Sequence, residues 1–159
     1  MKQVSRRRNS RGLASIEEKR RRNMRQLLLR ASRLVNRHVV SGLQARGYTD
    51  LRSTHTILLS NVDLAGSTVT AAAERAGITK QAMGRLASEL ENAGYIQVRR
   101  DPEDGRVRVL NFTEAGQQLM LDSLEVMADL EKRYALAVGE DRLNALLHDL
   151  EIFIEQAGR

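Results

Sequence analysis

The residues best suited to chemistry lie on one face of a predicted helix that begins after Thr79. Apolar residues recur at helical spacing on its other face, which leaves four polar side chains on the outer face: Lys80, Gln81, Arg85 and Ser88. They bring positive charge and hydrogen-bond donors, with no bulky apolar group among them. A guanidinium can donate two bonds to guanine O6 and N7, and the first turn of such a helix meets phosphates and base edges. The pattern is typical of a helix that lies in the DNA major groove.

A shorter helix before Gly77 is predicted to hold this helix in place. Between Thr68 and Ala76, small residues give a close-packing face, and Gly77 can take the left-handed backbone that ends a helix. Thr79 then caps the second helix through its side-chain oxygen, and it can also donate to a phosphate. The buried face of the second helix is expected to consist of Met83, Leu86, Ala87 and Leu90. Two packed helices joined by a glycine turn predict a helix-turn-helix.

Two segments rich in β-branched residues follow and predict a β-hairpin, or wing, directly behind this motif. They span residues 95–100 and 106–112, and the turn between them reads DPEDG. The hairpin carries four arginines as phosphate candidates: Arg99, Arg100, Arg106 and Arg108. Arg106 is expected to enter the neighbouring minor groove, whose negative potential attracts arginine. Asp104 cannot bind phosphate, so we expect it to pair with a nearby basic residue and fix the wing.

Each of these assignments has a plainer alternative. Arg85 can instead pair with Glu89, one helical turn away, and the arginines in the wing strands can simply be solvated. The whole domain can also be an architectural or protein-binding winged helix without operator recognition. An enzyme is not expected, because the sequence contains no nucleophile–base pairing, phosphate loop or metal-ligand spacing.

Long helices with apolar stripes are predicted at both ends of the chain. The first covers residues 15–47 and opens with a capping box formed by Ser15 and Glu18. A helix capped by Thr49 follows it. Two more helices cover residues 113–159, and a break at Gly139 separates them.

The composition predicts a cytoplasmic protein without cysteine chemistry. The chain has 159 residues, enough for one domain with a sizeable core, and no Cys, which excludes disulfides and thiol-based redox sensing. No apolar run approaches the length of a membrane span, and the N-terminus lacks the apolar segment of a secretory signal. Residues 1–46 carry fourteen Lys or Arg against two Glu. Residues 1–14 show no hydrophobic periodicity, so we expect a disordered basic tail that contacts phosphate or only aids solubility.

Together these motifs resemble the MarR family of winged-helix transcriptional regulators over residues 16–156. The resemblance rests on the helix-turn-helix, on the wing DPEDGR, and on the run Phe112-Thr113-Glu114-Ala115-Gly116 that follows it. It implies a mainly α fold with a small β-hairpin wing, obligate dimers built from terminal helices, and binding to palindromic operators. It also implies relief of repression by a small phenolic or anionic ligand. In the family, the residue matching Arg106 enters the minor groove.

Some features of the family do not carry over to this sequence. Gly84 stands at a recognition-helix position where the family more often has Thr or Ser. A mid-helix glycine costs roughly 0.5–1 kcal/mol relative to alanine, so we interpret Gly84 as a point of close approach, either to DNA or to a neighbouring helix. The family's ligand cleft suggests five lining residues here: Leu34, His38, Tyr48, His55 and Leu59. The histidines are isolated in sequence, so we expect neither a metal site nor a cofactor.

The expected organisation therefore has four parts. They are a disordered tail (residues 1–14), an N-terminal dimerisation helix (15–47), a winged helix-turn-helix that binds double-stranded DNA (48–112) and C-terminal dimerisation helices (113–159). The apolar stripes of the terminal helices exceed what the middle module covers, which favours an isologous homodimer over an intramolecular bundle. Such a dimer places two recognition helices about 34 Å apart, matching successive major grooves. The expected function is a ligand-responsive, sequence-specific repressor on a palindromic operator.

Overall fold

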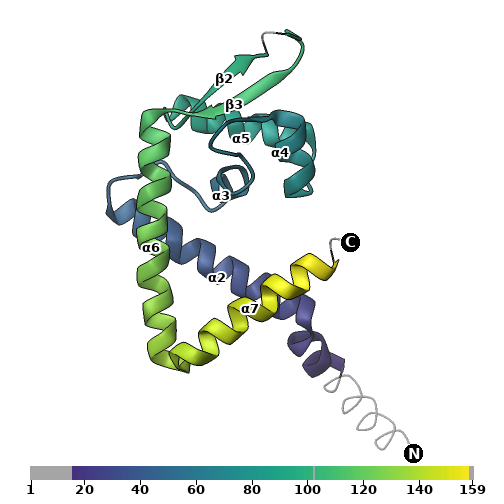
Figure 1. Cartoon of the computed structure of the whole chain (residues 1–159), viewed down its shortest axis with the longest axis vertical. Coiled ribbons are helices and arrows are strands. Elements are labelled where there is room, and N and C mark those ends of the chain that lie inside the picture. Colours follow the sequence, from purple (N-terminus) through teal and green to yellow (C-terminus); the bar gives the residue numbers. More distant parts are fainter. Residues whose placement is uncertain (1–15, 102, 158–159) are drawn as a thin grey trace, which may run out of the picture. The chain divides into compact units, whose positions relative to one another are not determined.

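The computed structural model describes residues 16–101 and 103–157 (Figure 1). The chain divides into two compact units, with the boundary between Arg37 and His38. Residues 16–22 of the first unit are helical. The predicted disordered tail and the capping side chain of Ser15 lie outside the described residues. No helix in the described part of the chain is long and apolar enough to cross a membrane.

The single helix predicted over residues 15–47 is wrong, because a bend at Asn23 interrupts it before α2 (Met24–Ala45) begins. The Asn23 amide donates to the carbonyl of Arg20 at 2.8 Å, and its Oδ1 accepts the backbone N–H of Gln26 at 3.0 Å. An asparagine that bonds the backbone on both sides competes with the helical ladder and caps the helix that follows. The predicted apolar stripe, from Met24 to Val39, therefore lies on α2 alone.

The predicted helix-turn-helix is present as α4 (Val69–Ala76) and α5 (Lys80–Asn92). Gly77 ends α4 in the left-handed conformation, at φ 64°. Thr79 caps α5, since its hydroxyl oxygen accepts the backbone N–H of Ala82 at 3.1 Å. Both local predictions, the glycine turn and the threonine cap, are confirmed.

The helix expected after Thr49 is much shorter than predicted. The segment forms turns, and α3 covers only His55–Leu59, with Thr54 at its N-cap and no side-chain cap bond. The side chain of Leu51 is buried, while the Gln44 amide donates to the Leu51 carbonyl at 2.8 Å. Burial and a side-chain partner from α2 thus hold this stretch in a non-helical path.

A three-stranded antiparallel sheet of order β1-β3-β2 completes the winged helix. The predicted hairpin is confirmed as β2 (Ile96–Arg100) and β3 (Arg108–Phe112), with the second strand starting two residues later than expected. The third strand, β1 (Ser67–Thr68), was not predicted, because two residues carry no alternation pattern. The hairpin lies beside α5 (Figure 1), and residues 103–106 in its turn are exposed.

The C-terminal helices are α6 (Glu114–Val138) and α7 (Glu140–Ala157), and the break at Gly139 is confirmed at φ 95°. Thr113 caps α6 by accepting the backbone N–H of Gly116 at 3.0 Å. The core lies in the winged helix and the start of α6, where the largest fully buried apolar side chains are Leu51, Leu58, Met83, Leu90, Ile96, Leu110 and Leu119. No described residue of α7 is buried within this chain.

Two polar contacts fasten α6 to the segment around the end of α2. The hydroxyl of Tyr48 donates to the carboxylate of Asp122, and Arg46 donates to Glu125 at 2.8 Å. The bond to Asp122 is the largest cause that raises the pKa of Tyr48 to about 12, and the same bond lowers the pKa of Asp122. At neutral pH the phenol therefore stays a donor and the carboxylate an acceptor, so α6 is fixed at a defined place on the winged helix.

Candidate nucleic-acid interface

The two faces of α5 divide as the sequence predicts. The inner face is buried at Met83, Ala87 and Leu90, and Leu86 is half-buried. The five polar side chains predicted for DNA contact are exposed: Thr79, Lys80, Gln81, Arg85 and Ser88. The hydroxyl of Ser88 donates to the carbonyl of Gly84 at 3.1 Å, so its oxygen is left to accept bonds.

Gly84 opens a gap in this outer face. Apart from the neighbouring backbone of α5, a Cβ placed on Gly84 would meet no atom of the described residues within 4 Å, and the Gly84 backbone is not in the left-handed region. The interpretation that Gly84 makes room for a neighbouring helix of this chain is therefore wrong. Among the described residues, no contact accounts for a glycine at the middle of this outer face.

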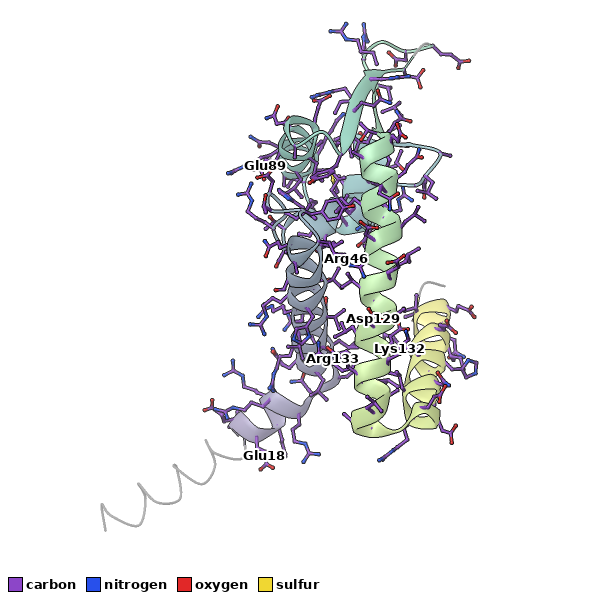
Figure 2. The ribbon with its side chains drawn as sticks, turned by 90° about the vertical axis from the view of Figure 1, so that its left-hand side faces the viewer. Glu18, Arg46, Glu89, Asp129, Lys132 and Arg133 are labelled. Carbon is purple, nitrogen blue, oxygen red and sulfur yellow. The ribbon has the colours of Figure 1, made fainter. Side chains whose placement is uncertain are left out.

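Glu89 on α5, labelled in Figure 2, has three nitrogen-bearing side chains around its carboxylate. The carboxylate oxygens lie 3.2 Å from Arg85 Nε, 3.0 Å from His55 Nε2 and 2.8 Å from a terminal nitrogen of Arg52. The hydrogen bond from His55 is the first cause that lowers the pKa of Glu89, which keeps the carboxylate charged. The Arg85–Glu89 spacing was visible in the sequence. The participation of Arg52 was not, because it lies 37 residues from Glu89.

The turn between the two wing strands is fixed by bonds from backbone N–H groups to aspartate side chains. Asp104 accepts the backbone N–H of Arg106 at 2.9 Å, so the expected pairing with a basic side chain is replaced by a bond to the main chain. Arg99, Arg100, Arg106 and Arg108 are all exposed. Arg100 and Arg108 stand directly opposite each other in the β2–β3 register. Like charges in a cross-strand pair destabilise a hairpin, and an anion between them would relieve that cost.

The residues suggested for a ligand cleft are in different surroundings. His55 and Leu59 are buried, and Tyr48 is engaged with Asp122. His38 bonds Tyr134 at 3.2 Å and lines a hollow of about 350 Å³. The other residues lining that hollow are Ser41, Gly42, Arg46, Val126, Asp129, Leu130 and Arg133. Asp129 and Arg133 project from α6 in Figure 2.

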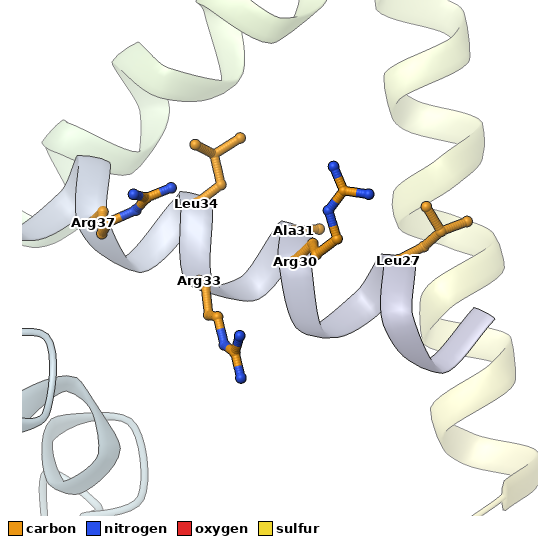
Figure 3. Close-up of a pocket in the computed structure, with 6 residues that line it drawn as sticks. All are labelled: Leu27, Arg30, Ala31, Arg33, Leu34 and Arg37. Atoms are coloured by element: carbon orange, nitrogen blue, oxygen red, sulfur yellow. The ribbon is translucent and has the colours of Figure 1, made fainter. Parts of the chain in front are cut away.

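Leu34 lies in the first unit and lines a separate hollow of about 440 Å³ on α2. Figure 3 shows Leu27, Arg30 and Leu34 projecting from one side of the helix and Arg33 from the opposite side. Guanidinium groups therefore border the apolar residues of this hollow. Such a surface suits contact with another protein at least as well as it suits a small molecule. Among the described residues, no three His, Asp or Glu lie close enough together to hold a metal ion.

Comparison with known proteins relates this arrangement to transcriptional regulators. Residues 49–107 match the model of the MarR family, and no curated protein matches the chain. A MarR-family regulator from Rhodococcus sp. RHA1 is 23% identical with a TM-score of 0.64, over 79% of this chain and 88% of that one. The reduced form of MarR from E. coli is 17% identical with a TM-score of 0.71, over 83% and 96%.

A third solved structure is the transcriptional repressor CouR bound to a 23-mer DNA duplex, at 21% identity and a TM-score of 0.65, over 85% of this chain and 94% of that one. These likenesses show a shared fold, mainly α with a small β wing. The matched segment spans α3 to the wing, which includes α5 and its polar outer face. The segment over residues 49–107 is therefore similar to the MarR family, and the chain shares its fold with these regulators.

Proposed function

We propose that the chain is a sequence-specific DNA-binding repressor that acts as a homodimer on a palindromic operator. The polar outer face of α5 carries the proposal. Its exposed donors and acceptors stand on a helix whose opposite face is anchored in the core, so the helix can enter a major groove without loss of packing. The solved complex of CouR with a DNA duplex supports the same use of this fold.

The charge of the wing supports a second contact with the same duplex. Arg100 and Arg108 repel each other across the hairpin, and Arg106 lies at the exposed tip. We assign Arg106 to the minor groove beside the groove occupied by α5, and the strand arginines to phosphates.

The homodimer is supported by apolar surface that this chain leaves uncovered. On α6 and α7 the exposed large hydrophobic residues are Leu121, Leu124, Leu136, Val138, Leu146, Leu147, Ile152, Phe153 and Ile154. Burial of a large apolar side chain contributes about 1.5–3 kcal/mol, so a helix without a buried residue needs a partner surface. A second copy supplies the same stripe in an isologous interface.

An effector would bind between α2 and α6. The hollow of about 350 Å³ brings His38, Arg46 and Arg133 together with apolar groups and with one carboxylate, that of Asp129. Positive and hydrogen-bonding groups beside an apolar wall suit a phenolic or carboxylate-bearing molecule. We propose that such a molecule, bound there, lowers DNA affinity by changing how α6 sits on the winged helix.

The DNA proposal is tested by selecting duplexes from a random pool with the wild-type protein and titrating the winner by fluorescence anisotropy. Arg85→Ala is expected to raise Kd and to relax sequence preference, because it removes a two-point contact with a base. Arg106→Ala is expected to raise Kd without unfolding the protein, which thermal unfolding checks. Unchanged Kd values for both variants would reject the assignment.

The alternative is an architectural winged helix that binds DNA without operator recognition. Genome-wide footprinting separates the two functions. A few strong palindromic sites support the repressor, whereas broad coverage without a shared sequence supports the architectural protein.

A further inference from the structure

The side chain of Glu89 joins the core of the winged helix to its outer face. It is only 24% exposed, yet it contacts two guanidinium groups that are largely open to solvent, those of Arg52 (64%) and Arg85 (82%). Arg52 comes from the turn before α3, whereas Glu89 and Arg85 lie on α5. One carboxylate therefore links the segment before α3 to the outer face of α5.

His55 anchors this carboxylate from the inside. Its side chain is 2% exposed, and its Nδ1 accepts the backbone N–H of Arg52 at 3.3 Å. An imidazole nitrogen that accepts a bond carries no proton, so the proton lies on Nε2 and is donated to Glu89 at 3.0 Å. Both nitrogens of this buried histidine are thereby satisfied. Glu89 has little freedom to follow the movements of the two arginines and instead restrains them.

The two guanidinium groups keep most of their donors. Arg85 contacts Glu89 through Nε. Within the described residues, its two terminal nitrogens have no hydrogen-bond partner. Arg52 contacts Glu89 through one terminal nitrogen and has no other side-chain partner there. Two positive groups share one negative group, which leaves a net positive charge at the exposed surface.

We propose that Arg52 is a phosphate contact of the DNA-binding face and that Glu89 is the positioning residue that holds Arg52 and Arg85 as one unit. This inference rests on the proposed function. Arg85, restrained at Nε, presents its terminal nitrogens to a base edge, and Arg52 presents its remaining donors to the phosphate backbone beside it. The pairing of Arg85 with Glu89 is then a support for DNA contact and not an alternative to it.

The test uses the full-length protein and the duplex that the wild type selects from a random pool. Arg52→Ala is expected to raise Kd about tenfold, the size of one lost charge-assisted hydrogen bond. The loss should be similar for the selected duplex and for one with a single substituted base pair. The slope of log Kd against log salt should fall by about 0.9, because one phosphate contact is removed. Arg52→Lys should restore the slope.

Glu89→Gln keeps the size of the side chain and tests positioning. We expect it to reduce the preference for the selected duplex over the substituted one about tenfold, because Arg85 is no longer restrained. Lys132→Ala is the matched control: this exposed lysine on α6 pairs only with Asp129 at 3.3 Å among the described residues. It removes one positive charge away from the proposed face and should leave both the salt slope and the preference unchanged.

The inference is overturned if Arg52→Ala leaves the salt slope unchanged, or if Glu89→Gln tightens binding with its preference intact. The second result would mean that Glu89 withholds Arg85 from DNA. Thermal unfolding of each variant shows whether a loss of DNA affinity comes from misfolding. If Glu89→Gln does not fold, Arg52→Ala still tests the phosphate contact, because Arg52 is exposed. A wild type that selects no duplex would instead reject the proposed function itself.

Discussion

At Gly84 the backbone of α5 is bare in the middle of its exposed face. Because none of the described residues fills the space, Gly84→Ala should stabilise the free protein by about 0.5–1 kcal/mol through helix propensity alone. We expect the same substitution to weaken binding to the selected duplex, since a Cβ there would meet the DNA. Chemical unfolding and anisotropy titration measure the two effects.

Asn92→Ala is the control for this glycine. It also raises helix propensity on α5, but at an exposed position in the last turn and outside the predicted DNA-contacting set. It should stabilise the protein without a change in Kd. If Gly84→Ala behaved in the same way, Gly84 would have no role in DNA contact.

Glu89 also gives the stability of the free protein a specific pH dependence. The hydrogen bond from His55 lowers its pKa from the ordinary value of 4.5, so the folded state binds the proton less tightly than the unfolded state. The stability that this carboxylate contributes is therefore complete well above pH 4.5 and is lost as the pH falls through the lowered folded-state pKa.

The variant Glu89→Gln removes the titrating group and provides the reference. The free energy of unfolding of the wild type should exceed that of the variant at neutral pH, and the difference should shrink as the pH falls below about 4.5. Urea unfolding at a series of pH values measures this. A difference that stays constant from pH 7 to pH 3 would show that the charge of Glu89 does not contribute.

Among the elements, the junction between the sheet and α6 depends on Gly116. A Cβ there would collide with the backbone carbonyl of Tyr95, which cannot move aside as a flexible side chain can. Gly116→Ala should therefore lower the free energy of unfolding by about 1–3 kcal/mol or more. Gly105→Ala, at a wing position with nothing within 4 Å and no positive φ, should leave stability nearly unchanged. Equal unfolding midpoints for the two variants would contradict this packing.

The elements that the sequence predicts well are those whose ends are set locally. The caps by Thr79 and Thr113 and the breaks at Gly77 and Gly139 each depend on residues within one turn, so helical period and capping rules locate them. The failures come from contacts made at longer range. The path around Leu51 depends on a side chain of α2, and β1 exists only because β3 lies beside it.

The same difference between local signals and long-range contacts applies to the candidate site. The polar face of α5 follows from periodicity, so the sequence alone predicts its residues. The group formed by Arg52, His55 and Glu89 depends on the packing of α3 against α5, and no spacing in the sequence indicates it.

For the whole molecule, the exposed apolar residues of α6 and α7 predict that the chain is not monomeric. A double variant, Leu146→Glu with Phe153→Glu, should convert a species of twice the 17.9 kDa chain mass into one of the single-chain mass. The dimer interface would otherwise have to bury two charged side chains. Light scattering after size-exclusion chromatography measures the mass. Leu64→Glu, at a residue 72% exposed outside the terminal helices, should leave it unchanged. A wild type with the single-chain mass at micromolar concentration would contradict the interface.

The most direct test of the central claim is the mass of the complex between the wild-type protein and its selected duplex, measured by sedimentation. We expect two chains on one duplex whose sequence contains an inverted repeat with half-sites about one helical turn apart. A single chain per duplex, or no binding to any duplex at low salt, would contradict the account of a two-fold symmetric DNA-binding protein.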